Sequence, residues 1–325
     1  MQNKIHIWVL IASLMLGVNS AFAQRDSVAK AIVLAQDQAI PVEVRVKKAL
    51  EIIDNSITHP QSAKDPFAWY VRGYVYKEWY KTFETQNKKS KTRLDAVVFL
   101  KKAIELDTTF GKPFSVTANF HYPVQIATVT LDFDQRTIKQ ILKYLGSTFY
   151  NDAGSLLDAA NYPTAIEDYD KFKECMLIAE PNYNIKAREI EFKNALATVY
   201  EKIFRSNIKV QSQFFGMTET LYKQVLVLDT NNNAANYNLA MLYYNYGVDL
   251  INNMSVTEDI VVIENITDES TALFKKALPY ALKANKLRPN NRDVLVCLMG
   301  IYFSLYEQEK SDEFKAKIAL LDKGK

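Results

Sequence analysis

The chain has 325 residues, and its 48% hydrophobic, 24% charged and 12% aromatic content is that of a packed protein rather than a disordered one. Glycine and proline are sparse, with 9 of each, which argues against a β-sandwich rich in turns. The formal charge of +3, from 40 basic and 37 acidic residues, is too balanced to indicate a nucleic-acid partner. Two cysteines and three histidines leave little material for a metal site or a disulfide scaffold.

Residues 1–23 have the pattern of a secretory signal peptide. Lys4 precedes an apolar run from Ile7 to Val18, and Ala21-Phe22-Ala23 places small residues at the two positions that a signal peptidase recognises. A helix of that length rises about 18 Å, short of the roughly 30 Å hydrocarbon core of a bilayer, so an uncleaved anchor is the weaker alternative. We expect cleavage after Ala23 and a periplasmic or secreted protein without a stable membrane span.

Residues 24–65 are predicted to form an N-terminal helical extension, a possible degenerate repeat, because the apolar residues of 42–57 fall on one helical face. Asp65 and Pro66 then match an N-cap followed by proline at the first helical position. A helix is therefore expected from Pro66 to about Lys81.

The next segments alternate between helix and less regular structure. Residues 82–92 have no apolar period and are predicted to be a solvated loop before a helix over 95–106. Residues 111–134 are rich in β-branched side chains, and the alternation at their end favours an extended backbone. We expect an irregular insertion there, with room for one short strand, and helices from about Thr137 to the C-terminus.

A short pattern recurs along the helical part: usually a leucine, then a small residue, then an aromatic residue three positions further on. The copies are Arg72-Gly73 with Tyr76, Leu145-Gly146 with Phe149, Leu196-Ala197 with Tyr200, Leu239-Ala240 with Tyr243, and Leu298-Met299 with Tyr302. These residues resemble the tetratricopeptide repeat (TPR) family, in which a small residue allows two helices to cross closely and an aromatic residue fills the gap.

The resemblance covers roughly residues 66–325, or about five helix pairs. It implies an all-α fold: an α-solenoid of TPR-like antiparallel helix pairs that stack on their sequence neighbours. The ends of the second helices are spaced more widely than the roughly 34 residues of the family, so long inter-helix insertions are expected.

Three insertions fall between the first and second helix of a pair, at 82–92, 206–216 and 252–266. Turns within pairs lie along one rim of a solenoid, so these segments are predicted to decorate the same edge, with 111–134 on the opposite edge. One hypothesis is that this rim is a contact surface. The alternative is that long loops are simply tolerated there.

The residues that could carry chemistry do not form a recognisable motif, so no enzymatic activity, metal or cofactor is expected. His59 and His121 have no histidine or cysteine at ligand spacing, and the sequence has no phosphate-binding glycine loop, GxSxG or HExxH. Cys175 and Cys297 lie among apolar residues and are expected to be buried thiols, although a disulfide between them stays possible.

The acidic residues around Asp168 lie on a predicted helix together with two lysines, Lys171 and Lys173. Charged residues of both signs in such spacing are typical of a helix face in water. We therefore expect a solvated face there rather than a pair of catalytic carboxylates.

Tyrosines crowd two of the predicted first helices, and some of them lie outside the packing positions of the repeat. The resemblance implies that first helices line a concave groove, and tyrosine is a favoured contact residue. A partner-binding groove is therefore hypothesised, lined by Tyr70, Tyr74, Tyr237, Asn238 and Met241. The carboxylate clamp of some family members is not carried over, because Ala234 and Met241 occupy positions where it would need charge.

The favoured function is a non-enzymatic protein–protein interaction scaffold or adaptor in the bacterial cell envelope. It would bind a protein or peptide partner through the concave helical groove and the loop-elaborated rim. The alternatives are a carbohydrate- or peptide-capturing periplasmic binding protein and a helical enzyme without a recognisable motif. The identity of the partner and the oligomeric state stay open.

Overall fold

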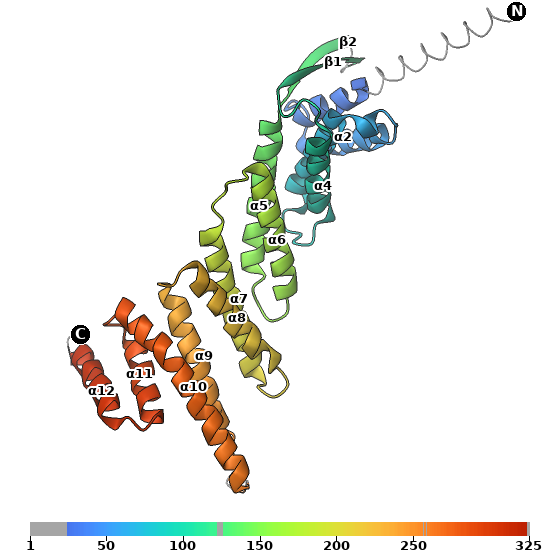
Figure 1. The fold of residues 1–325 in the computed structure, drawn as a ribbon. Helices are drawn as coiled ribbons and strands as arrows, with labels where there is room; N and C mark the ends of the chain where they lie inside the picture. The colour runs from blue at the N-terminus through green and yellow to red at the C-terminus, as the bar shows by residue number, and fades with distance from the viewer. Residues whose placement is uncertain (1–24, 122–125, 256, 258, 324–325) are drawn as a thin grey trace, which may run out of the picture. The chain divides into compact units, whose positions relative to one another are not determined.

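The computed structural model describes residues 25–121, 126–255, 257 and 259–323 (Figure 1). The predicted signal peptide, residues 1–23, lies outside the described residues. The contacts between residues divide the chain into two compact units, with the boundary inside a helix. The first unit holds the described residues up to 153 together with 167–183, and the second holds 154–166 and the described residues from 184 onward.

The first unit begins with a helix over residues 25–36 and continues with five further helical segments. These are α2 (Val42–Ile57), α3 (Pro66–Trp79), which runs on as a π-helical turn (Tyr80–Glu84), α4 (Lys91–Leu106), α5 (Gln135–Ser155) and α6 (Tyr162–Ala179). α3 begins where the sequence predicts, because the side chain of Asp65 accepts a hydrogen bond from the backbone N–H of Phe67 at 3.0 Å. The predicted loop over 82–92 is shorter than expected, since helical structure reaches Glu84 and resumes at Lys91.

The small residue of the repeat allows paired helices to approach closely. A Cβ atom added to Gly73 on α3 would lie 2.6 Å from Cγ of Leu100 on α4, a distance that packed side chains do not adopt. On α5, a Cβ at Gly146 would lie 3.1 Å from Cβ of Cys175 on α6. The packing role that the resemblance implies for these glycines is therefore confirmed in the first unit.

The sequence predicts an irregular insertion over residues 111–134, with room for one short strand. The structure instead shows an antiparallel β-hairpin in this range. β1 (Phe114–His121) pairs with β2 (Ile126–Phe133) in a register that places Phe114 opposite Phe133 and Ala118 opposite Val129. One face of the hairpin packs on the helix at 25–36, where Ala118 meets Ala29. The alternating residues that suggested one strand are the inward face of a two-stranded ribbon.

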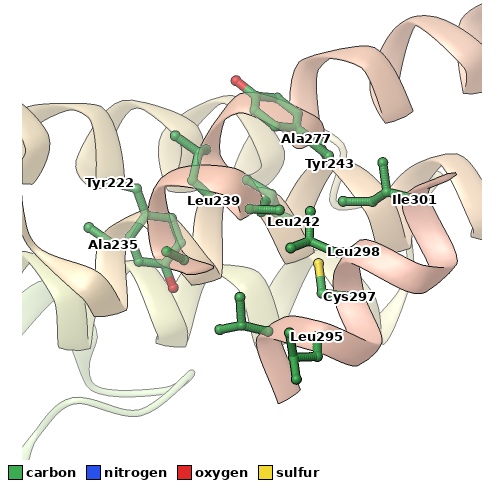
Figure 2. Packing of buried hydrophobic residues seen from close by; sticks show 14 of the residues in the cluster. Tyr222, Ala235, Leu239, Leu242, Tyr243, Ala277, Leu295, Cys297, Leu298 and Ile301 are labelled. Atoms are coloured by element: carbon green, nitrogen blue, oxygen red, sulfur yellow. The ribbon is translucent and has the colours of Figure 1, made fainter. Parts of the chain in front are cut away.

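The second unit consists of three antiparallel helix pairs. They are α7 (Lys186–Ser206) with α8 (Gln213–Leu228), α9 (Asn233–Asn252) with α10 (Ile260–Leu287), and α11 (Arg292–Ser304) with α12 (Gln308–Lys323). A single cluster of buried side chains joins the pairs and includes Tyr222, Leu239 and Leu298 (Figure 2). The predicted fold class, all-α antiparallel helix pairs stacked as a TPR-like solenoid, is confirmed, with the β-hairpin as the addition that the sequence did not predict.

The predicted insertions in the second unit are mainly extensions of helices. α9 reaches Asn252 and α10 starts at Ile260, so the loop expected over 252–266 shrinks to a short connection. Asp259 caps α10 by accepting a hydrogen bond from the N–H of Val261 at 2.8 Å. Lengthening both helices of a pair keeps their backbone groups hydrogen-bonded, which a loop of the same length would not do.

Candidate functional site

Tyr70 is the predicted groove residue whose position differs most from the expectation. Only 6% of Tyr70 is exposed, because the ring of Phe133 from β2 lies 5.3 Å from its own ring. Phe67 and Tyr74 lie 6.2 and 6.3 Å away, and burial raises the pKa of the Tyr70 hydroxyl. Tyr70 is therefore a packing residue under the hairpin and not an accessible contact.

Tyr74 is half-buried on the same helix, and Lys77 Nζ lies 4.2 Å from the centre of its ring. Burial raises the pKa of Tyr74, with a smaller contribution from the nearby carboxylate of Glu78. Burial lowers the pKa of Lys77, although the ammonium group pairs with Glu78. The two predicted residues of the first unit thus separate into one core residue and one partly accessible residue beside charged groups.

A small hollow of about 180 Å³ lies between α3 and α5 of the first unit. It is lined by Lys77, Lys81, Gln140, Ile141 and Tyr144. Its volume is below the range of about 300–1,000 Å³ that is usual for small-molecule sites, so it offers room for a single side chain of a partner.

The other three predicted residues, Tyr237, Asn238 and Met241, lie together on α9 and are all partly exposed. Tyr237 and Met241 pack with part of their surface against the core cluster. Asn238 lies near the hydroxyl of Tyr222 on α8 and slightly opposes the effect of burial, which raises the pKa of that hydroxyl to about 12. The structure thus brings together three of the five predicted residues, each anchored on one side and accessible on the other.

Two carboxylates that were not predicted accompany this patch. Burial raises the pKa of Tyr237, and the nearby Cys297, Asp293 on α11 and Glu201 on α7 add to the effect. Burial also raises the pKa of Glu201, against the opposing effect of Arg205. The inner-face patch, which we define as Tyr237, Asn238 and Met241 with Glu201 and Asp293, therefore combines a phenol, an amide and a thioether with two carboxylates.

Tyr244 on α9 follows the repeat aromatic Tyr243 and is another tyrosine outside the packing positions of the repeat, but it too is a packing residue. A Cβ added to Gly300 on α11 would lie 2.4 Å from its hydroxyl oxygen, and its ring lies 5.7 Å from that of Phe274 on α10. The absence of a side chain at Gly300 makes the space that the Tyr244 ring occupies. The sequence signal for the burial of Tyr244 is therefore Gly300, which lies on a different helix.

The sequence predicts a solvated helix face around Asp168, but the structure shows that Asp168 itself is buried. Asp168 Oδ1 lies 3.4 Å from Nη2 of Arg93, and Oδ2 of Asp152 lies 2.6 Å from Nη1. Arg93 is 1% exposed, and its guanidinium carbon lies 3.9 Å from the centre of the Phe149 ring. Burial raises the pKa of Asp168 to about 6 in spite of Arg93. These ion pairs hold α4, α5 and α6 together, which is a structural role.

The expectation of two buried thiols is confirmed. Cys175 and Cys297 are both buried and unpaired, and burial raises the pKa of each to about 12. Because the thiolate is the reactive form, neither side chain has the properties of a nucleophile near neutral pH.

A cavity of about 570 Å³ lies at the end of the second unit where α7 turns into α8 and α9 turns into α10. Its apolar lining comes from Ile208, Tyr246, Leu250, Met254 and Ile266, and its polar lining from Arg205, Asn207, Lys209, Ser212, Asp249 and Asn253. Two of the three predicted insertions, 206–216 and 252–266, thus meet at one hollow on one edge of this unit. We call this hollow the rim cavity.

Comparisons with known proteins yield distant structural matches only. No protein family and no curated protein matches the sequence. One similar solved structure is the type IV pilus biogenesis factor PilW, with 15% identity, coverage of 90% of this chain and 91% of that one, and a TM-score of 0.31. Another is the TPR2AB domain of yeast Sti1 in complex with a pHSP90, with 14% identity, coverage of 94% of this chain and 90% of that one, and a TM-score of 0.26. A third is the nuclear import adaptor Nro1 of S. pombe, with 10% identity, coverage of 92% and 93%, and a TM-score of 0.32.

At these TM-scores the fold is assigned from the helix pairing and not from the superpositions. Within the described ranges, no helix is long and apolar enough to cross a membrane. Among the same residues, no three or more His, Cys, Asp or Glu side chains are grouped to hold a metal ion.

Proposed function

We propose that this protein is a non-enzymatic scaffold or adaptor that binds a protein or peptide partner in the bacterial cell envelope. The observation that carries the proposal is the inner-face patch, in which Tyr237, Asn238 and Met241 are held by the core and still partly exposed. Aromatic side chains that are rigid before binding lose little conformational entropy when a partner arrives, which makes such a patch suitable for association.

The location in the envelope is proposed from residues 1–23, whose charge and apolar run are typical of a cleaved signal peptide. The non-enzymatic role is supported by what the buried reactive groups do: the thiols are shielded, and Arg93 and Asp168 bind each other. Tyr74 and its neighbouring charges form a second, smaller surface in the first unit that could contact the same partner.

The proposal is tested by replacing Tyr237 with a photoreactive phenylalanine analogue in the native host. Crosslinking from this position to one discrete protein is expected, and the same analogue at Val227, an exposed residue of α8, serves as the control. With the purified partner, Tyr237→Ala and Asn238→Ala together should weaken binding at least tenfold. Identical crosslinks from positions 237 and 227, or an unchanged affinity, would contradict the scaffold role of this patch.

The protein that carries the photoreactive analogue at position 237 also distinguishes the scaffold from the alternative of a carbohydrate- or peptide-capturing binding protein. If a glycan raises its melting temperature and protects position 237 from crosslinking, the patch is a sugar site and the proposed scaffold function is wrong. A partner protein that protects position 237 when no glycan does so supports the scaffold.

A further inference from the structure

The rim cavity arises because one helix pair is longer than its neighbour. Thr218 on α8 and Ala277 on α10 are equivalent positions, since each is buried and is followed by buried residues four and seven positions later. Counted from them, α10 starts about three turns, or about 18 Å, earlier than α8. Figure 1 shows this α9–α10 pair, in orange, reaching past the α7–α8 turn. The extra length supplies Ile266 and the end of α9 as one wall of the cavity.

The floor of the cavity is firm and apolar. Tyr246 stands against Phe204 and Phe215, with ring centres 5.3 and 4.8 Å away, and Phe204 is 2% exposed. Leu250 on the next turn of α9 packs partly against the core cluster. A volume of about 570 Å³ over such a floor is in the range of sites that enclose most of a ligand.

Apolar side chains of the cavity lining are still accessible to a partner. Ile208, Met254 and Ile266 all line the cavity and are only partly buried. Single exposed aliphatic residues are common, but several that line one cavity mark an interaction site. The surface therefore fits a partner segment with at least two apolar side chains.

The charges of the cavity favour a carboxylate. Arg205 and Lys209 make no ion pair with any of the described residues, and both are exposed. Opposing them are Asp249 in the lining and Glu201, whose charge acts on Arg205. Arg205 lies in the last turn of α7 and Lys209 in the α7–α8 connection, so the two cations come from one segment of the lining and Asp249 comes from α9.

We infer that the rim cavity binds a segment of a partner protein in which two adjacent aliphatic or aromatic residues are flanked by acidic ones. The apolar side chains enter the cavity and cover Ile208 and Ile266, and a flanking carboxylate pairs with Arg205 and Lys209. This inference rests on the proposed scaffold function and states the chemistry of the partner. The lining of the cavity contains no residue of the inner-face patch, although Glu201 of that patch lies one turn from Arg205 on α7.

The probes for the test are end-blocked, fluorescein-labelled hexapeptides with two apolar residues at the centre and acidic, basic or neutral polar flanks. Fluorescence polarisation with the full mature chain should show that acidic-flanked peptides bind at least tenfold more tightly than basic-flanked ones. Raising the salt concentration should weaken this binding, because the charges are exposed. Equal binding of the two sets, or no binding of any acidic-flanked peptide, would overturn the inference.

Matched variants locate the site. The double variant Arg205→Glu and Lys209→Glu should reverse the charge preference, whereas Lys202→Glu with Lys275→Glu, which alters two exposed lysines outside the cavity, should not. Ile208→Asn with Ile266→Asn, both in the lining and partly exposed, should weaken the binding of acidic-flanked peptides at least fivefold, with Val227→Asn as the control. The same loss in the control variants would overturn the assignment to this cavity, whereas crosslinking from position 237 tests the scaffold function independently.

Discussion

Tyr70 and Tyr237 start from the same sequence signal and end in opposite environments. Each is a tyrosine outside the packing positions of a first helix, one in the first unit and the other in the second. Tyr70 is buried because the β-hairpin places Phe133 against it, whereas Tyr237 keeps one side accessible on α9. The comparison shows that the position of a residue on a helix does not decide its exposure when an element far away in sequence can cover that face.

The interiors of the two units also differ, in whether they contain buried charges. The first contains a buried arginine with two carboxylates, whereas the main cluster of the second is apolar apart from tyrosine hydroxyls and one thiol (Figure 2). A buried charge is costly once its partner is removed, while an apolar core loses only the packing of the atoms removed. Substitutions in the two units should therefore differ in size and in pH dependence.

Arg93→Ala should have the largest effect, because it leaves Asp152 and Asp168 without their buried counter-charge. A loss of about 3–5 kcal/mol in the free energy of unfolding is expected. Denaturant unfolding followed by tryptophan fluorescence measures it: a mature chain that starts at Gln24 has Trp69 and Trp79 as its tryptophans, and both lie in the first unit. Arg205→Ala is the exposed control, and an equal loss there would contradict the prediction.

Phe133→Ala should destabilise the first unit by about 3–4 kcal/mol, since it removes a ring that is 1% exposed and uncovers Tyr70. Tyr237→Ala should cost less, about 1 kcal/mol, because that side chain is already partly exposed to water. Urea unfolding followed by circular dichroism compares the two variants on one scale. Equal losses would mean that Tyr237 is as much a core residue as the tyrosine under the hairpin.

The stability of the first unit should fall as the pH rises from about 4 to above 6. The pKa of Asp168 is raised by burial to about 6, so the folded protein holds a proton that the unfolded chain has already released. Stability is therefore higher below the unfolded pKa and is lost as the pH rises through the folded one, by up to about 3 kcal/mol. Unfolding followed at several pH values should show this slope.

Two variants of one helix isolate this effect. Asp168→Asn should flatten the slope, and Asp170→Asn, on the exposed side of α6, should leave it as it is. A wild-type slope that persists in Asp168→Asn would assign the pH dependence to another group.

Gly300→Ala should cost about 1–3 kcal/mol, because the new methyl group would collide with the Tyr244 ring. Gly216→Ala is the matched control: a Cβ there meets nothing within 4 Å, so the substitution should stabilise α8 by about 0.5–1 kcal/mol. Thermal unfolding of the two variants gives the sign directly. Destabilisation by both would mean that the effect is not due to the contact with Tyr244.

Most helices were predictable because their signals are local. The cap at Asp65, the proline after it and the recurring small residues act over a few positions, and the structure confirms the cap and the close packing at Gly73 and Gly146. The same locality explains why Tyr237, Asn238 and Met241 lie together and partly exposed on one helix, and their role in binding stays a prediction. A local pattern was enough wherever the contact was to the next helix of the chain.

The errors concern contacts between residues that are far apart in sequence. Arg93 was one of many basic residues in amphipathic helices, and nothing near it in sequence indicates Asp152 or Asp168 as its partners. The hairpin was underestimated because alternation over a few residues is a weak signal until its second strand is known. The sequence predicted only that the insertions bordering the rim cavity lie on one edge. It did not predict the cavity, because its floor depends on where Phe204, Phe215 and Tyr246 meet.

The hairpin also determines the order in which parts of the first unit can fold during synthesis. Helix pairs that contact their sequence neighbours can fold as soon as they leave the ribosome or a translocation channel. The helix at 25–36 cannot complete its contacts at that stage, because Asp26 accepts a hydrogen bond from the N–H of Asn119 and Ala29 is covered by Ala118. Ala29 and Val33 of this helix therefore stay uncovered until the hairpin has been synthesised.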